Sequence, residues 1–365
     1  MVLDPQRAHG LETGVMAYYA EAELYLIRLI ADAAARTGNA PNWAEASLLE
    51  VRRMRRAVHQ LNTQMVRDVP DLLVDAVDQA YTTGRVDAET ELQKIRAEVL
   101  PPSAIDHQAV VSLTRPGLES LAPVHQHLAR NVEDVWAVVT REVASQSVIG
   151  AKTTRQATQD AMNRLAREGM GFYRDKAGRR WGLDTYSEMA VRSTTNNALR
   201  AGHSSRLIEA GYDLVIVSSH KNPAPQCAPF ERKVLSLTGG TPSGTQVVEG
   251  EIVNVVASMS EAEAAGLHHV NCRHTHSLFQ PGVTPVEEPE PDPGHEGYKA
   301  TQRQRYLERQ VRASKRLEAA ALDEEEARKA RARARHYQGE LREHVEKWGL
   351  PRRRHREQLR TPALG

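Results

Sequence analysis

Apolar residues in the first part of the chain recur every three or four positions, the spacing of one face of an α-helix. Residues 11–37 carry this pattern and end at a glycine, and residues 51–65 carry it in alternating steps of three and four. The apolar positions are Val15, Tyr19, Leu26, Ile27 and Ile30, and then Val51, Met54, Val58, Leu61 and Met65. The pattern predicts amphipathic helices that pack through these faces.

Proline and glycine divide the rest of this region. Pro70 and Gly84 predict the two ends of a third helix, and residues 87–100 predict a fourth that is stopped by the prolines at 101 and 102. Further helical patterns precede and follow a break at Gly150. We therefore expect residues 1–170 to form an N-terminal helical domain.

From Gly171 the pattern changes to short apolar runs separated by turns. The segment GFYRDKAGRRW predicts a small hairpin, and residues 185–210 predict a helix. The β-branched runs YDLVIVSS, KVLSL and EIVNVVASM predict three strands, with the turn-rich segment TGGTPSGT between the last two. Residues 171–282 are therefore expected to form a small α+β module.

Beyond this module the chain becomes extended and then helical again. Residues 283–297 are rich in proline and acidic residues, which predicts a linker. Residues 298–365 are dominated by Glu, Arg, Lys and Ala, which predicts a basic tail built on one long exposed helix from about 298 to 347. The predicted fold class is α+β and predominantly α.

Composition agrees with this division. A length of 365 residues favours two domains, or one with long appendages, and aromatic residues at 5% require cores of Leu, Val, Ile and Ala. The start of the chain lacks the apolar run of a signal peptide, and no apolar stretch is long enough to span a bilayer. We expect a soluble protein made in a cytoplasm, without a membrane partner.

The net charge of +1 conceals an asymmetry. Residues 298–360 hold 19 Lys and Arg against 10 Asp and Glu, which leaves a tail near +9 on an acidic body near −8. Such a tail can bind nucleic acid, an acidic protein surface or the body of a neighbouring copy. It can equally be a solvated helix that neutralises its own charges.

Two polar segments beside the predicted strands carry the candidate chemistry. SSHKNPAPQCAPFERKVLSL holds the first histidine and cysteine, and GLHHVNCRHTHSLFQPG holds further histidines and the second cysteine. The candidate ligands of a structural zinc ion are His220, Cys227, His268 and Cys272. Zinc prefers thiolate sulfur and imidazole nitrogen in a tetrahedral set, and a small module gains folding energy from such a crosslink. A disulfide, a free thiol pair and ordinary loop residues stay open as alternatives.

Catalytic interpretations of the same residues have weaker support. A metal-dependent nuclease would use His268 or His269 as a base beside Arg273 and His274, but no carboxylate stands at a useful spacing. A cysteine nucleophile would pair Cys272 with His274 or His220.

Ser218 and Ser219 precede His220 without the glycines of a nucleophile elbow, and the chain has no phosphate-binding or dinucleotide fingerprint. The segment that contains Arg192, Ser193 and Thr194 is polar, yet hydroxyl and amide side chains there more often cap or bend a helix, or bond to a neighbouring strand, than form a site. We therefore expect no catalytic residues.

Four segments in order carry a resemblance to a known family: DKAGRRWGLDTYSEMAVRSTTNNAL, YDLVIVSSHKNPAPQCAPFERKVLSL, NCRHTHSLFQPG and YKATQRQRYLERQVRASKR. They resemble the phage minor capsid protein 2 family and, more loosely, the Mu-type head morphogenesis proteins. The resemblance covers residues 171–316. This chain departs from the family pattern in lacking its Trp-Gln-Gly stretch after His220, and in having His268 where relatives often have a cysteine.

The resemblance implies a structural, non-enzymatic protein of a tailed-phage head, internal or associated with the portal and involved in head morphogenesis. It implies that the partners are the portal or the major capsid protein, and that the location is the virion. Packaged DNA is a further candidate partner for the basic tail. A nuclease or toxin-like effector carried in the virion is the enzymatic alternative.

Overall fold

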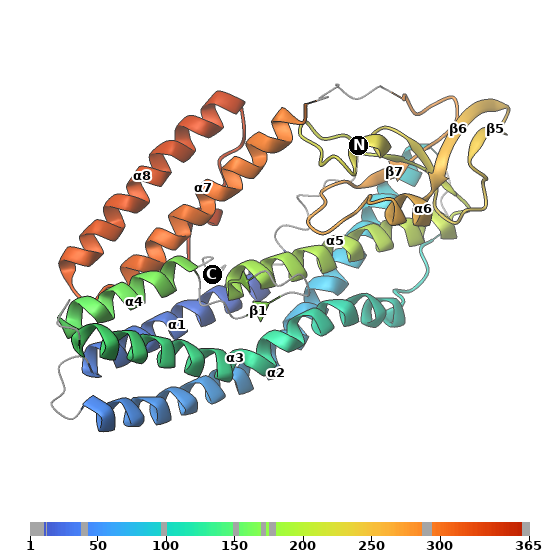
Figure 1. Ribbon diagram of the computed structural model, residues 1–365. Coiled ribbons are helices and arrows are strands. Elements are labelled where there is room, and N and C mark those ends of the chain that lie inside the picture. The colour runs from blue at the N-terminus through green and yellow to red at the C-terminus, as the bar shows by residue number, and fades with distance from the viewer. Residues whose placement is uncertain are drawn as a thin grey trace. The chain divides into compact units, whose positions relative to one another are not determined.

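A computed structural model describes residues 11, 13–37, 43–95, 101–148, 153–168, 173–174, 180–286 and 294–359. The helices are α1 (Thr13–Thr37), α2 (Trp43–Ile95), α3 (His107–Val148), α4 (Thr154–Glu168), α5 (Leu183–Glu209), α6 (Met259–Ala264), α7 (Glu296–Ala319) and α8 (Glu324–Trp348), with 3-10 turns η2 (Ala228–Phe230) and η3 (Arg354–Glu357) (Figure 1). The strands are β1 (Tyr173–Arg174), β2 (Arg180–Trp181), β3 (Leu214–Val217), β4 (Val234–Ser236), β5 (Gly244–Val248), β6 (Glu251–Ser258) and β7 (His276–Leu278). The predominantly α, α+β fold class is confirmed.

The chain divides into two units, and each is discontinuous in sequence. We call one the sheet unit, built from Leu72–Leu118 and Met189–Thr301, and the other the helical unit, built from Gly14–Asp71, Glu119–Glu188 and Gln302–Gly365. The four predicted ranges, 1–170, 171–282, 283–297 and 298–365, are contiguous instead. The difference arises because α2, α3, α5 and α7 each contribute residues to both units.

The sheet unit holds a five-stranded mixed sheet in the order β5-β6-β4-β3-β7. Strand β3 pairs antiparallel with β4 and β7, β4 pairs parallel with β6, and β5 forms a hairpin with β6. The predicted strands YDLVIVSS, KVLSL and EIVNVVASM are confirmed as β3, β4 and β6. Strands β5 and β7 were not predicted, because β5 is largely exposed and β7 is a three-residue polar strand, so neither has an apolar pattern.

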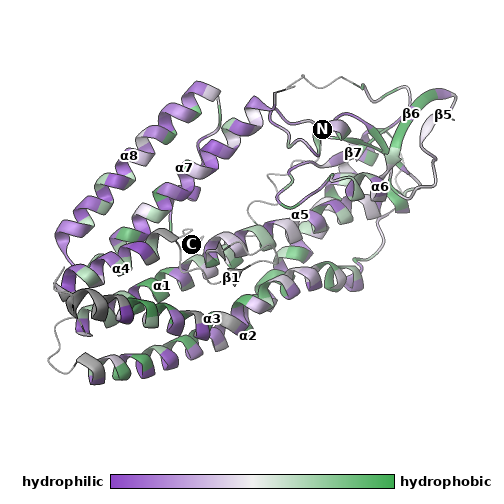
Figure 2. Ribbon diagram, in the orientation of Figure 1, coloured by the Kyte–Doolittle hydropathy of each residue, from purple (hydrophilic) through white to green (hydrophobic). Residues whose placement is uncertain are grey.

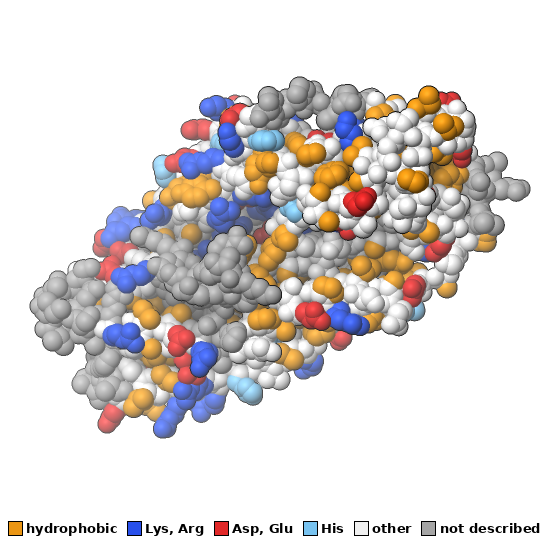
Figure 3. All heavy atoms as spheres, turned by 45° about the vertical axis from the view of Figure 1, so that its right-hand side comes forward, with side chains coloured by type: hydrophobic (Ala, Val, Ile, Leu, Met, Phe, Trp, Pro, Cys, Tyr) orange, Lys and Arg blue, Asp and Glu red, His pale blue; other side chains and the backbone are white. Residues whose placement is uncertain are grey.

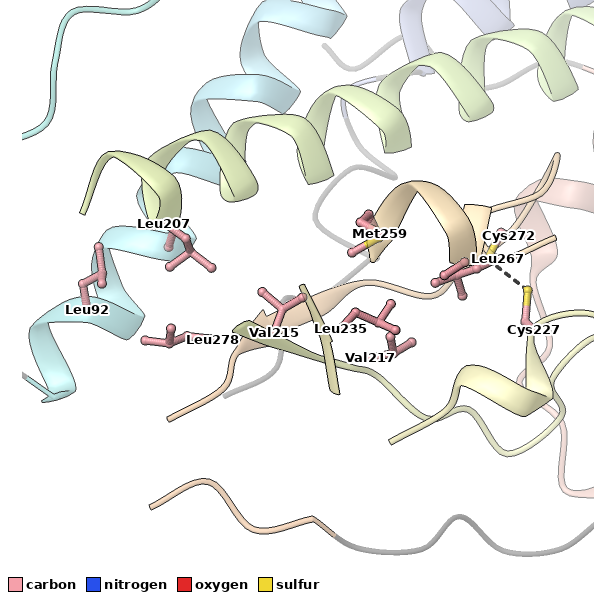
Figure 4. Close-up of a cluster of buried hydrophobic side chains, with 12 residues drawn as sticks. Leu92, Leu207, Val215, Val217, Cys227, Leu235, Met259, Leu267, Cys272 and Leu278 are labelled. Atoms are coloured by element: carbon pink, nitrogen blue, oxygen red, sulfur yellow. Dashed lines mark hydrogen bonds between the residues drawn. The ribbon is translucent and has the colours of Figure 1, made fainter. Parts of the chain in front are cut away.

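Apolar side chains cover both faces of this sheet. On one face Val215, Val217 and Leu235 pack with residues of α2, α5 and α6, and this cluster includes both cysteines (Figure 4). On the other face Leu214 and Ile216 pack with residues of β4, β6 and the segment after β7. Each fully buried Val, Leu or Ile contributes about 1.5–3 kcal/mol, so β3, buried along its whole length, is the centre of the unit.

Helices α2 and α5 approach each other closely in the sheet unit, and glycine makes this possible. A Cβ on Gly84 would lie 2.0 Å from the backbone oxygen of Leu199, and a Cβ on Gly202 would lie 2.0 Å from that of Tyr81. The prediction that Gly84 ends a helix is therefore wrong. Pro70 also lies inside α2, so the second, third and fourth predicted helices are one helix of 53 residues. Gly84 is required by the close packing of α2 against α5 and not by a turn.

The tail forms two helices and not the single long helix that was predicted. Helix α7 ends at Ala319, and Asp323 then caps α8 because its carboxylate accepts a hydrogen bond from the backbone N–H of Glu326. A small apolar cluster of Leu307, Leu341 and Val345 packs α7 against α8, although both helices are mostly hydrophilic (Figure 2). Within the helical unit, α1 buries Tyr19, Leu26 and neighbouring apolar residues, as its sequence pattern predicts.

The remaining predictions concern the small hairpin, the linker and the absence of membrane-spanning segments. Tyr173 pairs with Trp181 in an antiparallel ladder, which confirms the predicted hairpin. Its turn at 175–179 and the acidic centre of the linker at 287–293 lie outside the described residues. No helix in the part of the chain that the structure describes is long and apolar enough to cross a membrane.

Candidate functional site

Two cysteines from distant loops meet inside the sheet unit. Cys227 is the residue that precedes η2, and Cys272 lies in the loop between α6 and β7. Both are buried, and their Sγ atoms are 3.6 Å apart (Figure 4). Both are free thiols in the structure. His268 and Asn271 adopt left-handed backbone conformations, with φ of 58° and 64°, and so form the sharp turn that brings Cys272 to Cys227.

His274 completes this group. Its Nδ1 lies 3.3 Å from the Cys272 Sγ, and its Nε2 lies 2.8 Å from Oε1 of the buried Glu231. The backbone N–H of His274 donates to the same sulfur at 3.4 Å. Cys227, Cys272 and His274 therefore offer three metal-binding atoms that all lie within 4.8 Å of one another.

Two more histidines lie next to the group. His268 places its Nδ1 3.9 Å from the Cys272 Sγ, and the ring of His220 lies with its centroid 4.4 Å from that of His274. The Nε2 atoms of both histidines are buried without a hydrogen-bond partner. The backbone N–H of His220 donates to Glu231 at 2.6 Å.

The electrostatics of the group favour one thiolate. A hydrogen bond from Cys227 holds the pKa of Cys272 far below its usual range, and the same bond raises the pKa of Cys227. Burial opposes the charge on His274, but hydrogen bonds to Cys272 and Glu231 outweigh it and raise its pKa to about 9. Burial lowers the pKa of His220 and of His268 to about 4. Both are neutral at neutral pH and free to bind through nitrogen.

The structure thus brings together Cys227, Cys272 and His268 of the four predicted zinc ligands. His274, which was not among the four, forms a mutually close group with the two sulfurs, and this group does not include His220. Sequence reasoning missed Glu231, because the only signal was a carboxylate four residues after Cys227 in a loop. Its role depends on contacts with residues about 11 and 43 positions away, which no local pattern reports.

Neighbouring polar residues have structural partners. The hydroxyls of Thr194 and Thr195 donate to carbonyls one turn back in α5, as expected for this polar segment. Asn196 bonds to the Cys272 carbonyl at 3.4 Å, and the Ser218 hydroxyl accepts the backbone N–H of Thr275 at 3.0 Å. These contacts hold the cysteine loop onto α5 and β3.

A second buried histidine group lies beside the first. Nε2 of His276 is hydrogen-bonded to the Ser204 hydroxyl at 2.8 Å. The centroid of its ring lies 5.2 Å from that of His203, and Nε2 of His203 lies 3.2 Å from the Glu91 carboxylate. Glu91 also accepts the backbone N–H of Leu278 at 2.8 Å. Burial lowers the pKa of His276 well below its usual value. This group joins α2, α5 and β7 and was not predicted.

The basic tail has acidic partners inside the helical unit. Arg316 on α7 lies 3.4 Å from Asp184 and 3.9 Å from Glu23, and Arg312 lies 3.4 Å from the same Asp184. Arg356 pairs with Glu188 at 2.8 Å, and each of these arginines is at least nine-tenths buried. On the face of the molecule in Figure 3, exposed Lys and Arg side chains are interspersed with Asp and Glu. Part of the tail's positive charge is therefore neutralised by the rest of the chain.

Comparison with known proteins now identifies the class. The model of the family "Phage minor capsid protein 2" matches residues 3–346. A curated "Structural protein" of Lactococcus phage LL-H is 27% identical over 203 residues, which are 54% of this chain and 53% of that protein. The chain therefore spans about half the length of this curated relative. No solved structure matches.

A match over nearly the whole chain shows that the protein belongs to the phage minor capsid protein 2 family. It is a structural protein of a bacteriophage capsid, and its place is the virion.

Proposed function

We propose that the protein is an internal or portal-associated component of the phage head, made in the host cytoplasm, that acts in head morphogenesis by binding other head proteins. The observation that carries this proposal is the family match over residues 3–346, which includes segments of both units. The portal is the partner we favour, and the major capsid protein is the alternative.

We also propose that the protein is not an enzyme. Cys227, Cys272 and His274 are the residues best arranged for chemistry, yet at most 5% of each is exposed. A catalytic metal site keeps an open position for water or substrate. A cysteine nucleophile likewise needs access to its substrate. Burial of all three residues supports a structural role over the nuclease and cysteine-nucleophile alternatives.

Chemical crosslinking of mature phage and of DNA-free procapsids, followed by mass spectrometry, tests the proposed location and partner. We expect the protein in both particles, at low copy number, with crosslinks from exposed lysines to the portal. Crosslinks to the major capsid protein alone would contradict portal association. Absence from both particles would contradict a role in the head.

Contact with packaged DNA is a second candidate function, supported by one feature of α8. Arg328, Arg335 and Arg342 are exposed and recur every seven residues, so they lie along one side of the helix. Such a row can follow a phosphate backbone. Replacing all three with Gln should lower the slope of log K against log salt by about 2.7, since each phosphate contact on duplex DNA contributes about 0.9. A slope that is flat in the unsubstituted protein contradicts DNA binding.

A further inference from the structure

Three donor atoms of the buried cluster, from Cys227, Cys272 and His274, lie close enough together to share one metal ion. Tetrahedral zinc has bonds of about 2.3 Å to sulfur and about 2.0–2.1 Å to nitrogen, so its ligand atoms are about 3.3–3.8 Å apart. The two cysteine sulfurs are 3.6 Å apart, and the Cys272 sulfur lies 3.3 Å from Nδ1 of His274. The Nδ1 of His268 lies 3.9 Å from the same sulfur.

From this arrangement we propose that Cys227, Cys272, His274 and His268 bind one structural zinc ion in the sheet unit. Cys227, Cys272 and His274 form the mutually close core of the site. His268 lies outside this mutually close core, and we assign it as the fourth ligand because its Nδ1 is 3.9 Å from the Cys272 sulfur, whereas His220 packs against the ring of His274. This set keeps three of the ligands predicted from the sequence and replaces His220 with His274.

The surroundings of His274 are those of a zinc-bound histidine. Histidine ligands commonly donate their second ring N–H to a carboxylate, which fixes the tautomer and the ring orientation. Here Nε2 of His274 is 2.8 Å from Glu231, while Nδ1 faces the sulfurs. Glu231 is itself oriented by the backbone N–H of His220 at 2.6 Å. We assign Glu231 as the residue that positions His274.

Charge and burial also suit a structural ion. Two thiolates would offset the charge of Zn²⁺, and the buried guanidinium of Arg200 interacts with both cysteines and with His268. Thiolate and imidazole ligands favour zinc over magnesium or calcium, which bind oxygen. At most 5% of Cys227, Cys272 and His274 is exposed, so these three ligands are closed to solvent, while His268 is partly buried.

The ion would crosslink the loop before η2 to the loop before β7. Cys227 lies before η2 and Cys272 follows α6, 45 residues later, and both belong to the apolar cluster on one face of the sheet. Fixing these loops would hold β7 and η2 in place beside β3. A crosslink of this kind compensates for a small core that is short of aromatic residues.

Metal analysis of the full-length protein tests the site directly. Protein purified under reducing conditions should contain one zinc per chain, and a strong chelator should lower the Tm, with recovery on adding Zn²⁺. Co²⁺ in place of zinc should give the ultraviolet absorption of cobalt bound to thiolate sulfur. Protein that lacks metal, takes up no Co²⁺ and has a Tm unchanged by the chelator would overturn the proposal.

Substitutions separate the ligands from their neighbours. Cys227→Ser and Cys272→Ser should lose the ion, and His269→Ala in the same loop is the matched control that should keep it. Glu231→Gln should keep the fold and lower zinc affinity about 10–100-fold. Because a cysteine variant can fail to fold, the Glu231→Gln affinity, measured against a chelating dye, is the second readout, and an unchanged value would contradict the assigned role of Glu231.

The fourth ligand is decided by a pair of variants. His268→Ala should weaken Co²⁺ binding and change the intensity of its visible bands, which report the coordination number, whereas His220→Ala should leave both unchanged. The reverse result would show that the fourth ligand in this set is wrong. None of these outcomes depends on portal binding, so the metal site and the proposed function are tested independently.

Discussion

The two units of this protein differ in one kind of buried polar group. Besides buried ion pairs such as that of Arg206 with Glu89, the sheet unit buries a cluster of sulfur and imidazole nitrogen from Cys227, Cys272 and His274. The helical unit buries a network of full charges, with Arg316 and Arg312 against Asp184. Buried ions need partners, because desolvation otherwise costs several kcal/mol per charge. Sulfur and imidazole donors can also share a metal ion.

This contrast follows from what each part of the sequence has available. The helical unit is built from long helices rich in Arg and Glu, so ion pairs between helices are the natural way to satisfy its interior. The sheet unit has short strands and tight loops, and Cys272 lies within a few residues of several histidines, while Cys227 lies 45 residues earlier in the sequence. We therefore expect the stability of the helical unit to depend on pH and on the removal of charges. We expect the stability of the sheet unit to depend on metal binding and on backbone packing.

The largest effect should come from breaking the buried ion network. Arg316→Met leaves Asp184 without one of its two cations and removes the cation nearest to Glu23. Removing one partner of a buried ion pair costs about 3–5 kcal/mol. We expect a loss of that size in the free energy of unfolding, measured in urea.

Two variants control this prediction. Arg328→Met on the exposed side of α8 should change stability by less than about 0.5 kcal/mol. Adding Asp184→Asn to Arg316→Met should recover part of the loss, since it removes the charge left unpaired. Equal losses in the exposed and buried variants would show that the network does not stabilise the helical unit.

The next largest effect tests backbone packing in the sheet unit. In Gly202→Ala the new Cβ would lie 2.0 Å from the backbone oxygen of Tyr81, so α2 and α5 must move apart. Overpacking of this kind costs about 1–3 kcal/mol. Gly339→Ala, in α8, is the matched control because nothing lies within 4 Å of its Cβ. It should stabilise the protein by about 0.5–1 kcal/mol, and thermal melts of both variants would show opposite shifts.

A pH-dependent effect should follow from Glu23 in the helical unit. Burial, and then the charge of Asp184, raise the pKa of Glu23 from 4.5 to about 8. The folded protein therefore retains this proton while the unfolded chain loses it, so stability falls as pH rises from 4.5 to 8. Glu23→Gln removes this titration. Its Tm should match that of the parent near pH 4.5 and exceed it at pH 8, and a constant difference across this range would contradict the shifted pKa.

The smallest effect concerns the carboxylate of Asp213, which directly precedes β3 in the sheet unit. Burial alone would raise the pKa of Asp213, but hydrogen bonds from Thr238, Ser236 and Thr241 lower it from 3.8 to about 2. These bonds stabilise the fold above pH 3.8 and are lost as pH falls through 2. Asp213→Asn should cost about 1 kcal/mol at pH 7. The difference from the parent, followed by denaturant titration, should shrink below pH 3.8.

Local patterns were sufficient for much of the fold and only part of the site. The helical periodicity of residues 13–37 indicates burial of one face, and the β-branched runs of β3 and β6 indicate buried strands. The structure has the expected helix and strands at these places. The gathering of Cys227, Cys272 and His268 could be expected, because both segments flank strands of one small module. The place of His274, two residues beyond Cys272, depended on the turn between them and could not be predicted.

The sequence by itself determined where most of the helical segments lie, which residues are soft metal donors and how charge is divided along the chain, because these depend on side-chain chemistry and short-range spacing. Tertiary structure alone decided that Gly84 lies within a helix, that Glu231 orients His274, and that arginines of the tail pair with Asp184 and Glu188. Each of these depends on a contact between residues distant in sequence. Only packing of the folded chain brings such residues within hydrogen-bonding or van der Waals distance.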